Sequence, residues 1–409
     1  MSTTFSGGKY GAGPYGGQTP PPFLPVIPVL IELYDNNLGY KGAYQTGVGG
    51  FVGVKFTLDE SGPVNFTLIF TGPQIIVKRD IIKIKLFGIP DYFFTGVVRN
   101  TPIAGSTKAE FNYTGFGLND YLLRVNTESK NYITKTLAYI LDDILDTIII
   151  PKTPINKNNG KINPPDITIT SFTVNYSQIP DVLDALKNVA NSSGEIYHSG
   201  VDETGDFFFK PKPIDTVVTL VVGARGKYGI PSYEPQDEFE AITKLFILDD
   251  NGNLVTTVSS TEENDILEEK ALAPQLGAAD ILKWGEGILA EREINRRQAS
   301  VDWPIEEADP IPLLGHGAVR IISNIPPTDP TPPNSNPFGS GVFGSELFGG
   351  GQIDWETLND TLLVKETAYT LTGAESIRSI SLGAVPVRVT DQIIKLNKKI
   401  LNLVINIGK

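Results

Sequence analysis

Residues 92–125 read YFFTGVVRNTPIAGSTKAEFNYTGFGLNDYLLRV, and the rest of the chain can be interpreted outward from this segment. Its two runs of aromatic and β-branched residues are separated by a segment rich in small residues and proline. Runs of this composition, bounded by Gly, Pro and Asp, are typical of strands. We expect the last part, LNDYLLRV, to form a short helical piece. The segment therefore predicts a pair of strands that leads into a helix.

The residues upstream of this segment have the same character. The runs VKFTLDE (54–60), VNFTLIFTG (64–72) and IIVKRDIIKIKLFG (75–88) are rich in β-branched and aromatic residues and partly alternate between apolar and polar. Alternation with a period of two is the pattern of a half-buried strand. We predict a β-rich domain at 29–117, either a barrel or a sandwich. The preceding residues 1–28 are Gly/Tyr/Pro-rich and are expected to form an extended arm.

Downstream, the apolar period changes to three and four residues. Such spacing indicates an amphipathic helix, which we place at 131–148, ended by Pro151. Its predicted buried stripe consists of Ile133, Leu137, Ile140, Leu141, Ile144, Leu145 and Ile148. A second helix is expected after Pro180, with a stop at Gly194, followed by a hairpin turn at 202–205. Residues 118–212 are therefore predicted to form an α+β domain.

The remainder alternates between ordered and low-complexity segments. We predict a second β-barrel domain at 213–325, with a helix at 276–296 and a hairpin turn at Asn251-Gly252. Residues 326–352 form a Gly/Pro/Phe-rich loop, and 353–409 a C-terminal β segment with an amphipathic helix. The fold class is mainly β with α+β insertions, built from β-barrel or sandwich domains and a few amphipathic helices.

Composition excludes several kinds of site. The chain has 409 residues and no cysteine, so disulfides, thiolate metal sites and a cysteine nucleophile are excluded. The two histidines, His198 and His316, lie far apart and are interpreted as turn or surface residues. A formal net charge of -13 disfavours binding to phosphate backbones or anionic lipid. We expect no metal and no cofactor. No signal or membrane helix is found at the N-terminus, so assembly in a cytoplasm without membrane insertion is expected.

Candidate catalytic residues are few. The segment SYEPQDEFE offers Glu234, Asp237, Glu238 and Glu240 as a possible carboxylate pair, but charge runs beside a proline loop are usually solvated. Nucleophile-elbow, phosphate-loop, zinc-protease and dinucleotide-binding motifs are absent from the sequence. We therefore assign no catalytic, cofactor or metal site and predict that the chain is not an enzyme.

The order of elements resembles that of the hub proteins at the tip of bacteriophage tails. The similar features are a strand ending in Thr95-Gly96, the turn Tyr113–Gly117, the helix Leu183–Ala190, and the hairpin from Ile196 to Pro211 with its glycine turn at Gly205. Residues 296–321 are similar to the closing barrel strands of that family. The resemblance covers about residues 50–325.

The resemblance implies a subunit of tube-like β domains that assembles as a ring, commonly a homotrimer. Such a tail-tip or baseplate hub caps the tail tube and contacts distal tail, tube, spike or fibre proteins. Genomic DNA passes through its lumen during ejection without specific binding, and an acidic lumen would repel the phosphates. The resemblance thus predicts a structural virion protein located at the tail tip, with no lytic domain.

Two glycine-aromatic segments, Tyr10–Gly17 and Phe338–Gly351, depart from the family pattern. Glycine lets the backbone lie close to another surface, and aromatic side chains bring large apolar area at a low entropic cost. We interpret these segments as interface arms that reach neighbouring subunits, with a flexible linker as the alternative for the first. The candidate contact residues are Tyr10, Tyr15, Phe338, Phe343 and Phe348. A receptor-binding or glycan-degrading tail protein remains the alternative function.

Overall fold

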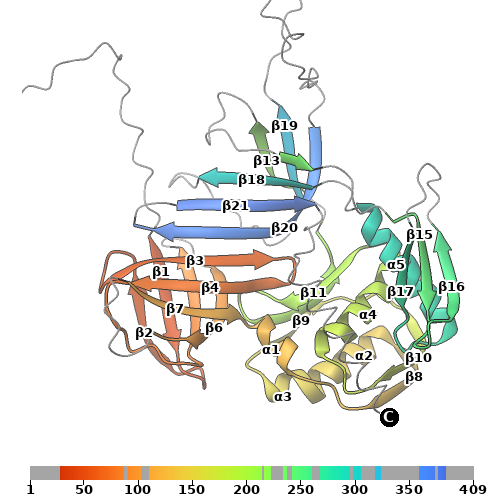
Figure 1. Cartoon of the computed structure of the whole chain (residues 1–409). Coiled ribbons are helices and arrows are strands. Elements are labelled where there is room, and N and C mark those ends of the chain that lie inside the picture. The colour runs from red at the N-terminus through yellow and green to blue at the C-terminus, as the bar shows by residue number, and fades with distance from the viewer. Residues whose placement is uncertain are drawn as a thin grey trace, which may run out of the picture.

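A computed structural model describes most of the chain (Figure 1). The described residues are 28–86, 91–102, 110–213, 216–222, 234–236, 242–259, 268–294, 298–304, 318–323, 359–373 and 376–383. They form mainly antiparallel strands with a few helices. The predicted mainly-β fold class is confirmed.

The N-terminal strands form a curled, barrel-like sheet with the order β3-β4-β7-β6-β5-β1-β2. Alternate residues of β1 are buried, as the period-two pattern requires. Aromatic side chains fill the interior, and the rings of Tyr44 on β2 and Phe70 on β4 lie 5.1 Å apart across it. The strands are β1 (Val29–Tyr34), β2 (Tyr40–Gln45), β3 (Phe51–Asp59), β4 (Gly62–Phe70), β5 (Ile81–Leu86), β6 (Tyr92–Asn100) and β7 (Phe111–Gly117).

C-terminal strands extend this sheet instead of forming a separate one. β20 (Asn359–Thr372) pairs antiparallel with β3, and Tyr369 stacks on Phe56 with ring centroids 4.7 Å apart. β21 (Ser376–Gly383), β18 (Gln298–Pro304) and β14 (Glu234–Gln236) follow in order. β19 (Ala318–Ser323) pairs with β20 and with β13 (Thr216–Val222), which completes a 13-stranded sheet.

An α+β unit packs beside the barrel-like sheet (Figure 1). The first half of this unit contains α1 (Asn119–Arg124), β8 (Lys130–Thr136), α2 (Leu137–Ile144), a π-helical turn (Leu145–Ile149), α3 (Ile150–Lys152), β9 (Asn156–Ile162), β10 (Thr168–Val174), α4 (Ile179–Asn191), β11 (Tyr197–Val201) and β12 (Asp206–Pro211). Its second half contains β15 (Lys244–Leu248), β16 (Leu254–Ser259), β17 (Glu268–Leu272) and α5 (Ala278–Ile294).

Both halves of this unit contribute to one apolar core. α5 lies so close to α4 that a Cβ on Gly287 would be 1.8 Å from the carbonyl oxygen of Asn188. The prediction grouped β15–β17 and α5 with a barrel at 213–325. Because their apolar side chains join the core of 118–212, we propose that they belong to the α+β unit.

Several local predictions are confirmed. The helix expected at 276–296 is α5, the helix expected after Pro180 is α4, and LNDYLLRV contains α1. The hairpins at 202–205 and at Asn251-Gly252 are present, with both turn glycines at positive φ. The C-terminal amphipathic helix and residues 1–27 of the predicted arm lie outside the described residues.

The prediction of a helix at 131–148 was wrong at its start, and Pro151 does not end the helix, because α3 includes it. Residues 130–136 form β8, which pairs antiparallel with β10, and the helix begins at Leu137. Ile133 faces outward and is exposed, whereas Leu137 and the later stripe residues are buried. The hydroxyl of Thr136 accepts a hydrogen bond from the backbone N–H of Tyr139, which caps the helix where the strand ends. Among the described residues, no helix is both long and apolar enough to span a membrane.

Candidate functional site

The contact between the barrel-like sheet and the α+β unit is built around the β3–β4 turn, residues 59–62. The backbone N–H of Val201 on β11 donates to the carbonyl of Ser61 at 3.1 Å and to Asn119 Oδ1 at 2.8 Å. The amide nitrogen of Asn119 in turn donates to the carbonyl of Ser61. One asparagine from α1 therefore ties the turn to β11. We call this region the junction.

Two glycines allow the close approach of these backbones. A Cβ on Gly200 would lie 1.9 Å from the carbonyl oxygen of Ser61, and one on Gly62 would lie 1.9 Å from that of Val201. Gly62 also has φ +111°, a conformation that side-chain-bearing residues rarely adopt. No larger residue fits at either position without moving the two units apart.

An ion cluster lies beside this turn. Glu60 Oε2 pairs with the ammonium groups of Lys212, at the end of the β11–β12 hairpin, and of Lys365 on β20, the latter at 3.3 Å. Both lysine side chains are buried, whereas the Glu60 side chain is 33% exposed. Burial by itself would raise the pKa of Glu60, but the two ammonium groups outweigh it and hold that pKa well below its usual range. Glu60 therefore remains charged and links three segments that are distant in sequence.

The neighbouring acid behaves differently. Burial raises the pKa of Asp59 to about 6, with the charges of Glu60 and Glu366 acting in the same direction. Hydrogen bonds from the backbone N–H and the hydroxyl of Ser61, at 2.7 Å and 2.6 Å, partly offset this rise.

His198 lies in the junction, so its interpretation as a turn or surface residue was wrong. It is a buried residue of β11 whose Nδ1 lies 3.1 Å from the carbonyl oxygen of Glu60. Its ring centroid is 4.8 Å from that of Phe208 on β12. His198 therefore packs between Phe208 and the β3–β4 turn. The other histidine of the chain, His316, lies outside the described residues.

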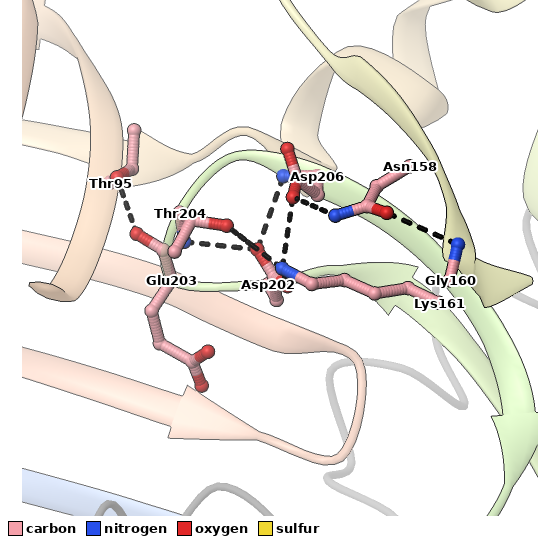
Figure 2. A network of polar contacts seen from close by, with 8 residues as sticks. All are labelled: Thr95, Asn158, Gly160, Lys161, Asp202, Glu203, Thr204 and Asp206. Atoms are coloured by element: carbon pink, nitrogen blue, oxygen red, sulfur yellow. Dashed lines mark hydrogen bonds and ion pairs between the residues drawn. The ribbon is translucent and has the colours of Figure 1, made fainter. Parts of the chain in front are cut away.

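A second polar network organises the turn of the β11–β12 hairpin (Figure 2). Asp202 Oδ1 accepts hydrogen bonds from the backbone N–H of Thr204 at 2.9 Å and of Asp206 at 3.1 Å, and from the Thr204 hydroxyl at 2.6 Å. Lys161 on β9 donates to the carboxylates of Asp202 and Asp206. Burial would lower the pKa of Lys161, but these two carboxylates outweigh it and raise that pKa. The network fixes the turn against β9.

The tip of this turn contacts the barrel-like sheet. The hydroxyl of Thr95 on β6 donates to the backbone carbonyl of Glu203 at 2.5 Å, and this contact is buried. Figure 2 shows the Glu203 carboxylate pointing away from Lys161. Burial raises the pKa of Glu203 to about 7. The hairpin therefore connects β9 to β6 through hydrogen bonds at both sides of its turn.

An apolar groove of about 390 Å³ lies next to the junction, between the sheet and helices α1 and α4. Its apolar lining is Pro63, Val64, Phe116, Leu122, Leu123, Pro180 and Leu183. The contacts of the junction hold the barrel-like sheet and the α+β unit in a fixed relation. In the described part of the chain, no group of three or more His, Asp or Glu side chains could hold a metal ion.

The predicted interface residues are not placed by this structure. Tyr10, Tyr15, Phe338, Phe343 and Phe348 all lie outside the described residues. Of the four carboxylates considered for catalysis, Glu234 lies on β14 opposite Ser300, and Asp237, Glu238 and Glu240 lie outside the described residues.

Sequence reasoning missed the junction residues. The hairpin turn DETGD was recognised as a turn, but not as a contact with β6 and β9. The β3–β4 turn DESG carried one available signal, because a glycine after an acidic pair at the end of a strand indicates a tight turn. Nothing local indicates that Glu60 meets Lys212 and Lys365.

Comparison with solved structures identifies the fold. A tail protein from Neisseria meningitidis MC58 superposes with a TM-score of 0.59 at 10% identity, covering 89% of this chain and 98% of that chain. The 43 kDa tail protein of prophage MuSo2 from Shewanella oneidensis gives 0.56 at 14% identity, covering 87% and 98%. Prophage tail protein gp18 from Listeria monocytogenes EGD-e gives 0.50 at 12% identity, covering 90% and 98%.

No protein-family model and no curated protein matches the sequence. The likeness is therefore one of fold, and it extends over nearly the full length of each tail protein. The chain has the fold of bacteriophage tail proteins, which confirms the resemblance indicated by the sequence.

Proposed function

We propose that this chain is a structural protein of a phage-type tail, located in the virion as a tail-tip or baseplate hub. In this proposal copies of the chain form a ring, a homotrimer, at the end of the tail tube. The ring gives passage to DNA and anchors spike or fibre proteins. The observation that carries the proposal is the fold shared with three tail proteins over 98% of the length of each.

The junction supports a structural role. A ring subunit has to hold its parts in a constant orientation, because the closure of the ring depends on the angle between its contact surfaces. Here the ion cluster of Glu60 and the backbone contacts of Val201 with Ser61 join the barrel-like sheet to the α+β unit. The described contacts suit a rigid building block, and we assign no catalytic step to the chain.

The charge of the chain supports passage of DNA without binding. A net charge of -13 gives a surface that repels phosphate unless cations are gathered at the bore. We propose that acidic side chains face the lumen and that the arms with Tyr10, Tyr15, Phe338, Phe343 and Phe348 contact neighbouring subunits or tail proteins.

The mass and shape of the purified full-length chain test the proposal. We expect native mass spectrometry to give three times the mass of one chain, and electron microscopy to show a ring with an axial hole. A chain that stays monomeric at every concentration, alone and with tail extract, would contradict the hub. A ring whose bore is basic would contradict only the proposed lumen.

Deletion of residues 334–351 separates the hub from a receptor-binding protein. Loss of assembly is expected if this segment reaches a neighbouring subunit. If assembly stays intact while binding to host cells is lost, the segment has a receptor role instead. The matched control is replacement of the segment by a Gly/Ser linker of equal length, which keeps the chain connection but removes the aromatic residues.

A further inference from the structure

Large apolar side chains are exposed on the outer side of the barrel-like sheet. Ile75 is 72% exposed and Val77 55%, both in the loop between β4 and β5. Val48, in the turn after β2, is 61% exposed, and Tyr40, at the start of β2, is 63% exposed. Figure 1 places β2 at the outer edge of this sheet, away from the α+β unit. We call the surface formed by these four residues with Lys41, Lys78 and Arg79 the β2 face.

Contacts within the chain bring the parts of the β2 face together. Lys41 on β2 donates to Asp80 at 2.6 Å and to the backbone carbonyl of Ile75 at 3.4 Å. On the other side, Gln74 Nε2 donates to the carbonyl of Gly49 at 3.4 Å, in the turn that carries Val48. The loop and the strand therefore present one surface.

The loop is held in a defined conformation. Ile76 is buried between the two exposed residues, so it anchors the loop in the core. The buried carboxylate of Asp80 accepts from the backbone N–H of Val77 at 2.9 Å, and Tyr113 Oη accepts from that of Gln74 at 2.7 Å. Arg79 has φ +74°, a conformation that costs a side-chain-bearing residue about 1 kcal/mol or more. Because the loop is already ordered, its exposed side chains lose little entropy when they bind.

β2 is also an edge strand of the sheet. Among the described residues, β2 pairs with β1 on one side and has no strand on its other side. Unpaired edges of this kind accept a strand from another chain unless they are protected. At the other end of the path of the sheet lies a different edge strand, β14. Among the described residues, β13, which pairs only with β19, is a further edge strand, so the edges of one copy are unlike.

The charge of the β2 face is opposite to that of the chain as a whole. Lys78 and Arg79 are exposed and Lys41 is partly exposed, whereas the carboxylate beside them, Asp80, is buried. The whole chain carries a net charge of -13. A second copy carries an excess of acidic side chains that can pair with these cations, and complementary charge speeds and orients association.

We propose that the β2 face binds a different surface of a second copy of this chain. Contact between two unlike surfaces is heterologous, and it generates a ring when the rotation between copies closes. The inference rests on the proposed ring and names the surface through which the ring forms.

Variants on the loop test this inference. Ile75→Asp with Val77→Asp places two carboxylates on the β2 face, and both positions are exposed, so the fold is expected to survive. The matched control is Leu254→Asp with Leu272→Asp, which changes two similarly exposed residues, at 58% and 55%, on the β15–β16–β17 sheet. Native mass spectrometry and light scattering of the full-length chain measure assembly, and circular dichroism measures folding.

We expect the loop variant to be folded and monomeric at concentrations at which the wild type and the control variant are assembled. Lys78→Glu with Arg79→Glu is expected to weaken assembly as well, and the loss should shrink at high salt because charges on the surface are screened. A loop variant that assembles like the wild type overturns the inference and leaves the ring standing. A wild type that never assembles removes the proposed ring itself.

Discussion

Replacement of Glu60 by glutamine removes one charge from the junction and keeps its shape. The substitution leaves the buried ammonium groups of Lys212 and Lys365 without the carboxylate that they share. Removal of one partner from a buried ion pair typically costs about 3–5 kcal/mol. Because Glu60 is 33% exposed, we expect a cost near the lower end, about 3 kcal/mol.

The backbone N–H of Val201 reports this change directly, since it donates to Ser61 and Asn119 across the junction. A loss of about 3 kcal/mol corresponds to roughly a hundredfold faster opening, at about 1.36 kcal/mol per factor of ten. Hydrogen exchange at neutral pH, read by mass spectrometry on peptides that contain Val201, measures the rate. The same contribution is fully present above the ordinary carboxyl pKa of 4.5 and is lost as the pH falls through the lowered pKa of Glu60.

The matched control is Glu268→Gln on β17. Glu268 pairs with Lys244 at 3.1 Å, but both side chains are well exposed, at 46% and 36%. Exposed pairs of this kind contribute less than about 1 kcal/mol, so exchange at Val201 is expected to stay unchanged. If exchange at Val201 in Glu60→Gln equals that of the wild type, the ion cluster does not hold the junction and the reasoning is refuted.

Two further changes test the contact between the barrel-like sheet and the α+β unit. Burial raises the pKa of Glu203 from 4.5 to about 7. The protonated carboxyl therefore stabilises the fold below pH 4.5, and this stabilisation, about 3 kcal/mol, is lost as the pH rises through about 7. Glu203→Gln, whose side chain cannot ionise, should therefore be more stable than the wild type above pH 7 but not below pH 4.5. Urea unfolding measures both free energies. A variant as stable as the wild type at both ends of this range would contradict the buried position of Glu203. Gly200→Ala brings a Cβ to 1.9 Å from the carbonyl of Ser61 and should cost about 3 kcal/mol or more, whereas Gly72→Ala, which meets nothing within 4 Å, should change the unfolding free energy by less than about 0.5 kcal/mol. Similar effects of the two alanines would show that the backbones at the junction are not packed closely.

Elements with strong local signals could be predicted from the sequence. α4 has apolar residues at helical spacing after Pro180, and the β15–β16 hairpin has Asn251-Gly252 between alternating runs. In both cases the local preference and the tertiary packing agree. The mainly-β class and the resemblance to phage tail proteins followed from such elements and their order.

The start of the helix near residue 131 could not be read from periodicity alone. Ile133 lies four residues before Leu137 and so fits the helical stripe, but pairing with β10 turns it outward in a strand. The β-branched residues of YITKT favour a strand, and Thr136 is a good N-cap, so the boundary had a local signal that the apolar period concealed.

The junction could not be predicted for a different reason. Glu60 is 152 residues from Lys212 and 305 residues from Lys365 in the sequence. Contacts at such separations depend on how β3, β12 and β20 are arranged, and a single sequence holds no local trace of that arrangement. The same limit applies to the pairing of β20 with β3.

The pairing of β20 with β3 has a consequence for synthesis on the ribosome. The first seven strands are complete at Gly117, but the strand that covers the outer edge of β3 begins only at Asn359. At about 5–20 residues per second, translation of the intervening segment takes roughly ten to fifty seconds. During that time the nascent chain carries an open β-edge, and a chaperone that shields it is expected to raise the yield of correctly folded subunits.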